Sequence, residues 1–374
     1  MIVLTKKEDI EDFVRGTTFF GTGGGGSPKK GLELLENDLK NGKKLFWVDY
    51  TEISKDSKSV CPFLMGSIAP ETEEIQKKKL ELGFVKKTVE NPLVNAVQEL
   101  EKYTGEKAEI IVPVELGGGN TPGPMDVAAN LGKTLVDGDY AGRAIPEIVQ
   151  ITPHIFGKKV TPIAAVDEYG DVSIIKESIN NEVAERIGKL ISEAAFGLAG
   201  EAGILIDAKE LDKLLIKGTL TESLELGKAI RLAREGNKDP IQAIIEKTGG
   251  YLLFEGTVSK KDWEDKEGYM WGTHTIKGEN KFKGKEFKIW FKNENHISWL
   301  NNEIYVTSPD RIEVVRKKDG EPITNTDLKV GEKVSVIGIK AREIFRTEEG
   351  LKVLGPKHFG FDHKYEPIEK IMEE

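Results

Sequence analysis

The spacing of hydrophobic residues changes at Tyr251, and this change constrains the fold more than any other feature of the chain. Before it, apolar runs such as residues 59–67 ("SVCPFLMGS") alternate with segments of helical periodicity such as residues 92–105 ("PLVNAVQELEKYTG"). After it come short runs of period two, as in residues 285–300. A period near 3.6 is typical of helices and a period of two of strands. We therefore predict a two-domain α+β protein: an α/β layered N-terminal domain, then a helical segment and a β-rich C-terminal domain.

The expected boundary between the two domains lies at residue 166. Residues 1–166 form the predicted α/β domain, which contains two glycine-rich loops. The C-terminal domain is expected to begin with a helical part, residues 167–250, followed by a β-rich sandwich or barrel over residues 251–345. The last segment, residues 346–374, is expected to pack back on this domain. A chain of 374 residues is long enough for two cores.

Composition excludes several classes of partner and site. The net charge of −9 argues against broad binding to nucleic acid or to an anionic membrane surface. No run of 18 apolar residues exists that could span a bilayer, and the start does not resemble a secretory signal. Cys61 is the one cysteine, so an intramolecular disulfide and a cysteine-rich zinc site are excluded. We expect a cytoplasmic protein.

Five glycines occur within residues 21–26 ("GTGGGG"). Formally, Gly21-x-Gly23-x-x-Gly26 fits the dinucleotide fingerprint, which requires a preceding strand. Residues 6–16 ("KKEDIEDFVRG") instead predict a helix that ends at Gly16, so we expect no nucleotide cofactor.

Two interpretations of this loop remain open. The backbone N–H groups of Gly23, Gly24 and Gly25 could hold a carboxylate, an oxyanion or an anionic ring heterocycle at the start of the next helix. Alternatively, the loop is rich in glycine because two chain segments cross closely there.

A second group of polar residues falls within residues 114–147, at predicted strand ends and in turns. Ligand-binding side chains collect at such loops in α/β sheets. Each residue taken alone could serve a turn, an ion pair or a helix. Their clustering beside the glycine loops favours a polar pocket. The group consists of Glu115, Asn120, Asp137, Asp139, Arg143 and Glu147.

The motifs "GTGGGGSP", "MGSIAPETEE", "ELGGGN" and "DGDYAGRAIPE" resemble the N-terminal motifs of the S-methyl thiohydantoin desulfurase family. The later segments "NENHISW", "SPDRIEVV" and "GPKHFGFDHKYEPIE" are similar to its C-terminal domain, so the resemblance covers almost the whole chain in order. The chain departs from the family at Ile68, where a proline is usual. The family's next glutamate is carried onto Glu73, although Glu74 follows directly.

The resemblance implies a hydrolase that acts on a small five-membered cyclic amide or amidine, either S-methyl thiohydantoin or a hydantoin-like ring. Water would attack an amidine-like carbon, so the site needs a base and groups that stabilise negative charge on the ring. For the base we expect Asp137 or Asp139, then Glu115, and for the charge Arg143. The expected substrate-binding residues are Gly23, Gly24, Gly25, Asn120, Glu73 and Glu147.

A divalent metal, zinc or manganese, is a further expectation. Asp139, Glu115 and His154 would hold it, and a metal-bound hydroxide would replace the carboxylate base. The alternative to an enzyme is a non-catalytic, ligand-binding accessory subunit of a hydantoinase/oxoprolinase-type complex. In either case we expect a small-molecule ligand and a homo-oligomer.

Overall fold

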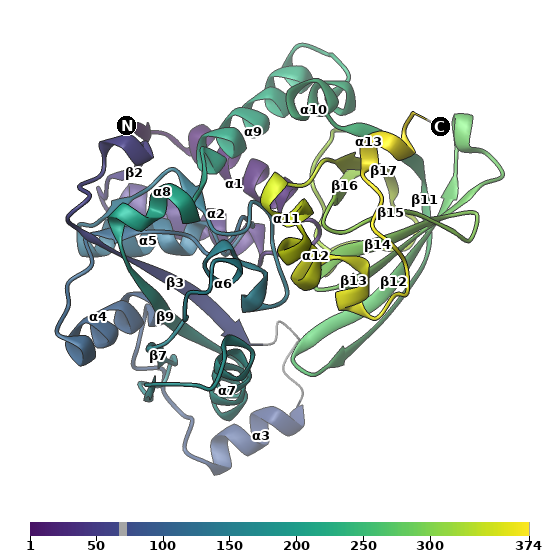
Figure 1. Cartoon of the computed structure of the whole chain (residues 1–374). Helices are drawn as coiled ribbons and strands as arrows, with labels where there is room; N and C mark the ends of the chain where they lie inside the picture. The colour runs from purple at the N-terminus through teal and green to yellow at the C-terminus, as the bar shows by residue number, and fades with distance from the viewer. Residues whose placement is uncertain (67–72, 374) are drawn as a thin grey trace.

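A six-stranded mixed sheet forms the centre of the N-terminal lobe in the computed structural model, which describes residues 1–66 and 73–373 (Figure 1). The strands, in spatial order, are β5 (Thr134–Leu135), β4 (Ile110–Ile111), β3 (Lys58–Gly66), β9 (Leu198–Asp207), β7 (Ile163–Val166) and β8 (Val172–Ile175). Strands β3, β4 and β5 run parallel, whereas β9 pairs antiparallel with β3 along most of its length. The predicted boundary at residue 166 therefore cuts through this sheet, because β8 and β9 follow it.

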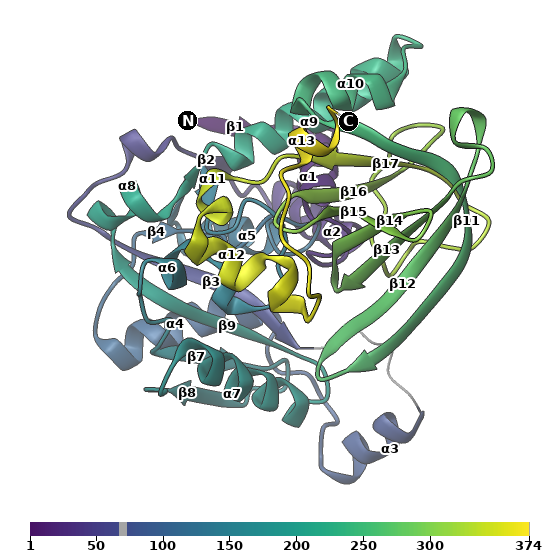
Figure 2. The ribbon, with the colours of Figure 1, turned by 45° about the vertical axis from the view of Figure 1, so that its right-hand side comes forward.

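Helices cover both faces of the sheet. Helices α4 (Pro92–Thr104) and α5 (Pro122–Leu131) contact one face, and α7 (Asn181–Ala194) lies on the other (Figures 1 and 2). The prediction of α4 is confirmed: Asn91 caps its first turn, and Gly105 ends it in the left-handed conformation.

The helix expected over residues 143–156 is wrong. The segment forms a 3₁₀ turn, η2 (Ile148–Gln150), and the single helical turn α6 (Thr152–Ile155). Two prolines explain this result, since Pro146 disfavours helical backbone at Ile145 and Pro153 suits a first turn.

Helix α1 (Lys7–Phe20) crosses α9 (Thr219–Glu235) at close range. The sequence predicted that α1 ends at Gly16, but the helix continues through this residue. A Cβ atom at Gly16 would lie 1.7 Å from the carbonyl oxygen of Ser223, and one at Gly227 would lie 1.8 Å from that of Asp12. Gly16 is therefore a packing residue rather than a helix end.

A seven-stranded antiparallel sheet forms the second lobe and confirms the predicted β-rich region. Its ends curve toward each other as a half-barrel, so that β14 also contacts β16. The strands, in spatial order, are β15 (Glu303–Thr307), β14 (Glu294–Leu300), β13 (Glu286–Lys292), β12 (Tyr269–Gly278), β11 (Tyr251–Lys266), β17 (Lys333–Ile339) and β16 (Arg311–Arg316). One hydrophobic core joins the lobes, since Phe13 of α1 and Leu226 of α9 share it with Ile337 of β17.

The last segment of the chain lies across the junction of the two lobes (Figure 2). It contains α11 (Glu343–Arg346), α12 (Glu348–Leu354), η5 (Pro356–Phe359) and α13 (Ile368–Ile371). The carboxylate of the buried Asp310 accepts hydrogen bonds from Arg346, Tyr365 and the Ile368 N–H. These bonds hold the segment against the second lobe.

The remaining elements are short or peripheral. They are β1 (Ile2–Leu4), α2 (Pro28–Lys40), β2 (Leu45–Trp47), η1 (Tyr50–Glu52), α3 (Glu73–Glu81), β6 (Gly138–Asp139), η3 (Ala208–Glu210), α8 (Leu211–Leu214), β10 (Ile216–Lys217), α10 (Pro240–Thr248) and η4 (Asn280–Phe282). Across residues 1–66 and 73–373, no helix has the length and apolar character needed to cross a membrane.

Candidate active site

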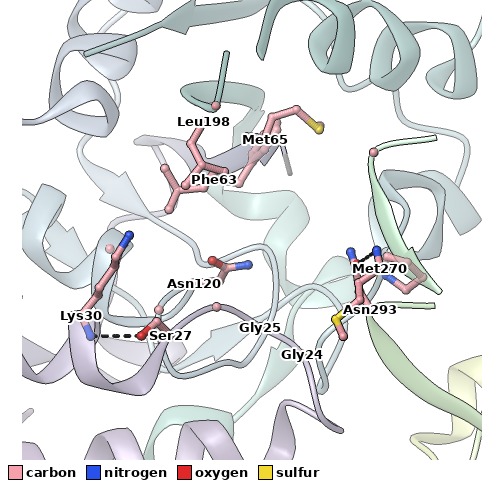
Figure 3. Close-up of a pocket in the computed structure, with 18 of the residues that line it drawn as sticks. Gly24, Gly25, Ser27, Lys30, Phe63, Met65, Asn120, Leu198, Met270 and Asn293 are labelled. Carbon is pink, nitrogen blue, oxygen red and sulfur yellow. Dashed lines mark hydrogen bonds between the residues drawn. The ribbon is translucent and has the colours of Figure 1, made fainter. Parts of the chain in front are cut away.

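A cavity of about 640 Å³ lies between the two lobes. The N-terminal lobe contributes the glycine loop, the end of β3 and the loop before α5; the second lobe contributes the starts of β12 and β14 and residues 324–327. Figure 3 shows the side chain of Asn120 between the glycine loop and the apolar side chains of Phe63, Met65 and Leu198. The cavity thus combines a polar floor with an apolar wall, as is typical of small-molecule sites.

The glycine loop both lines the cavity and is crossed closely by other segments. The Gly25 carbonyl accepts hydrogen bonds from the N–H groups of Gly119 and Asn120, at 3.0 Å each. A Cβ atom at Gly24 would lie 1.9 Å from Glu294 Oε1, and one at Gly25 would lie 2.5 Å from the Gly117 Cα. Close crossing therefore accounts for these glycines.

The Gly25 N–H donates to the carboxyl group of Glu294. The acceptor at this position of the predicted anion cradle is therefore a side chain of the protein itself, and the cradle is part of the cavity floor.

Glu115 is a buried carboxylate in the cavity wall. Its Oε1 accepts a hydrogen bond of 2.5 Å from Asn120 Nδ2, and its Oε2 accepts one of 2.7 Å from the Ile145 N–H. Burial, aided by the charge of Asp139, raises the pKa of Glu115 to about 7 despite these bonds. A fixed carboxylate that titrates near neutral pH suits a general base.

Glu294, the first residue of β14, faces the same cavity from the second lobe. It is 2% exposed, and its Oε2 has no hydrogen-bond partner among the described residues. Burial and the neighbouring Glu115 raise its pKa well above the ordinary value, and Arg143 offsets this only in part. The sequence analysis missed Glu294 as a site residue. The available signal was a glutamate within the "NENHISW" motif, at the start of a strand.

Asp137 and Asp139 do not line the cavity. Asp137 accepts hydrogen bonds from the N–H groups of Leu220 and Thr221, at 3.0 and 3.1 Å, and so holds the first turn of α9. Asp139 Oδ1 accepts from the N–H groups of Ala141 and Gly142, at 2.7 and 2.5 Å. Burial raises the pKa of Asp139 to about 6. Both aspartates therefore shape the wall behind Glu115 rather than face the cavity.

Arg143 is also buried and does not line the cavity. Its guanidinium donates to Thr22 Oγ1 and to the Asn295 carbonyl, at 3.0 Å each, and to the Pro309 carbonyl at 3.3 Å. These bonds tie the glycine loop of one lobe to the strands of the other. We assign Arg143 to the support of the site.

The structure does not bring the predicted metal ligands together. His154 lies on α6, where its Nδ1 is 3.0 Å from Asn181 Nδ2, and it does not line the cavity with Glu115. Within the described ranges, no group of three or more His, Cys, Asp or Glu side chains is placed to hold a metal ion. The predicted set of Asp139, Glu115 and His154 therefore does not fit a metal, and we route no step through one.

Glu73 is the first residue of α3, where it is exposed and does not line the cavity. Ile68, at which the chain departs from the family pattern, lies outside the described residues.

Glu147 lines the cavity where the C-terminal segment meets both lobes. One carboxylate oxygen binds Lys292 Nζ, and the other lies 2.8 Å from His358 Nε2. Burial raises the pKa of Glu147, but the hydrogen bond and charge of His358, with the charge of Lys292, outweigh it and lower the pKa to about 2. Glu147 therefore joins three parts of the chain and is ionised at neutral pH.

This ion cluster predicts a pH-dependent effect on stability. Because the folded pKa of Glu147 lies below its ordinary value of 4.5, its contribution is present above about pH 4.5 and is lost as the pH falls toward 2. We expect Glu147→Gln to lower the free energy of unfolding by about 2 kcal/mol at pH 7, and by less at about pH 3. Urea denaturation at both pH values measures this, with the exposed Glu303→Gln as control. An equal loss at both pH values would contradict it.

Tyr269, at the turn between β11 and β12, closes another side of the cavity. Its hydroxyl donates to Glu185 Oε1 of α7 at 2.8 Å, and the ammonium of Lys189 lies 3.0 Å from the same oxygen. Figure 1 shows the long β11–β12 hairpin reaching toward α7. The sequence gave no signal for this contact, which joins distant segments.

Comparisons with known proteins agree with this architecture. The family model described as "S-Me-THD-like, N-terminal domain" matches residues 8–177, and "S-Me-THD-like, C-terminal domain" matches residues 179–368. A crystal structure of a protein from Chromobacterium violaceum superimposes with a TM-score of 0.80 and 23% sequence identity, covering 98% of this chain and 100% of that one. This likeness shows a shared fold. No curated protein matched the chain.

Proposed function

The chain belongs to the S-Me-THD-like family, that of S-methyl thiohydantoin desulfurase, and on this premise we propose that it is a hydrolase of small five-membered rings. The substrate is a cyclic amidine or amide, S-methyl thiohydantoin or a hydantoin-like ring, and it binds in the cavity between the lobes.

The observation that carries this proposal is Glu115. It is a buried carboxylate in the cavity wall, both of its oxygens are held by the protein, and its pKa is about 7. An ionised Glu115 takes a proton from water as the water attacks the ring carbon. Asn120 and the Ile145 N–H fix the direction of this carboxylate, so the base does not need to reorient during the reaction.

The leaving group places few demands on the site. A methylthiolate departs readily, so the protein must chiefly activate water and accommodate the negative charge that develops on the ring. The floor next to Glu115 supplies polar groups for the ring from the loop before α5 and from Asn293 and Asn325 of the second lobe.

The test is turnover by the purified chain alone. We expect it to release methanethiol from S-methyl thiohydantoin, measured with a thiol reagent, or to hydrolyse a hydantoin-like ring, measured by chromatography. If the chain binds these rings in calorimetry and converts none of them, the proposal is wrong and the ligand-binding accessory role takes its place.

A further inference from the structure

We propose that Glu294 is the general acid of this site and delivers its carboxyl proton to a ring nitrogen while Glu115 takes a proton from water. This inference rests on the proposed function and adds a second reacting group to it. It also assigns the two groups to different lobes, so that the site is complete only where the lobes meet.

The placement of Glu294 is the first argument. Glu294 and Glu115 both line the cavity and are both buried, and each influences the charge of the other. Glu294 Oε1 lies against Gly24, and the Gly25 N–H donates to the carboxyl group. Oε2 has no hydrogen-bond partner among the described residues, so a ligand in the cavity can supply one. A buried polar atom without a partner is costly, which favours a functional reason for keeping it.

The charges around Glu294 are the second argument. A buried carboxyl group loses its proton readily only when a cation pairs with it. Arg143 is the nearby cation, but its guanidinium donates to Thr22, Asn295, Ser308 and Pro309, not to Glu294. Lys292, which pairs with Glu294 across β13 and β14, binds Glu147 instead. Glu115 faces Glu294 as a second acid, so one of the two keeps its proton at neutral pH.

The reaction balances with these two groups. In the first step the water oxygen bonds to the amidine carbon, Glu115 takes a water proton, and the C=N electron pair moves to the ring nitrogen, which takes the Glu294 proton. In the second step Glu294 takes back the hydroxyl proton as the carbonyl forms, and the C–S bond breaks with its electrons on sulfur. The methylthiolate then takes the proton from Glu115. The products are hydantoin and methanethiol, and both glutamates regain their starting state.

Glu201 provides a matched control for Glu294. It is a fully buried glutamate of β9, neither of its oxygens has a hydrogen-bond partner in the described part of the chain, and burial raises its pKa to about 8. Unlike Glu294, it does not line the cavity. A Glu→Gln change at either position therefore makes the same chemical alteration in a buried setting.

The experiment compares the pH dependence of kcat in the wild type, Glu294→Gln and Glu201→Gln with S-methyl thiohydantoin as substrate. We expect Glu294→Gln to lower kcat by about 10²-fold or more, with KM changed by less than about threefold. It should also lose the alkaline limb of the profile while the acidic limb, set by Glu115, remains. Glu201→Gln should keep both limbs.

A direct measurement of the proton accompanies the kinetics. Infrared difference spectra between the wild type and Glu294→Gln at neutral pH are expected to show the carbonyl band of a protonated acid. An ionised Glu294 in these spectra, or a Glu294→Gln variant with unchanged kcat and alkaline limb, would overturn the proposal and leave the hydrolase function standing. A wild type that converts no ring overturns both.

Discussion

Replacing Glu115 by glutamine is expected to lower kcat for ring hydrolysis by about 10³-fold. Glutamine keeps the size of the side chain and an oxygen for Asn120 or Ile145, but it cannot take a proton from water. The loss should fall on kcat more than on KM, because the water proton moves only in the transition state. Steady-state assays of thiol release measure it.

Two controls accompany this variant. Glu201→Gln should keep turnover, since Glu201 is buried in the same lobe and lies outside the cavity lining. Calorimetry with the ring should show that Glu115→Gln still binds it. Full turnover by Glu115→Gln would show that another group activates the water, and the assignment would fail.

Gly16→Ala is expected to destabilise the protein by about 3 kcal/mol. The added Cβ atom would lie 1.7 Å from the carbonyl oxygen of Ser223, so α1 and α9 would have to move apart. Helix propensity alone predicts the opposite sign, because alanine stabilises a helix interior by about 1 kcal/mol relative to glycine. Denaturation in urea or guanidinium, followed by circular dichroism, measures the difference.

Gly197→Ala is the matched control. A Cβ atom at Gly197 would meet nothing within 4 Å, and its backbone is not in the left-handed region. We therefore expect a change below about 1 kcal/mol for this variant. If Gly16→Ala proved as stable as the wild type, the close crossing of α1 and α9 would be contradicted.

The periodicity of the sequence predicted much of the fold. The change at Tyr251 marks the first strand of the antiparallel sheet, and the unbroken apolar run of β3 fits a strand covered on both faces. The boundary at residue 166 could not be placed correctly from periodicity, because β9 returns to pair with β3 after a helical segment. Pairing between distant strands leaves no local pattern.

The candidate site was predicted in part, for a related reason. Polar residues gathered near two glycine loops correctly pointed to Glu115, Asn120 and Glu147 as cavity residues. The same gathering included Asp137 and Arg143, whose hydrogen bonds are taken by protein groups behind the cavity. Sequence spacing identifies a polar loop, but it does not show on which side of the loop a side chain lies.

The central claim is that the ring binds between the carboxyl groups at positions 115 and 294. The most direct test is a crystal structure of the slow Glu115→Gln variant with S-methyl thiohydantoin. The account predicts a ring in the inter-lobe cavity, with its amidine carbon facing position 115 and a ring nitrogen within hydrogen-bond distance of the Glu294 carboxyl. A ring bound outside this cavity, or bound there with neither side chain in contact, would contradict it.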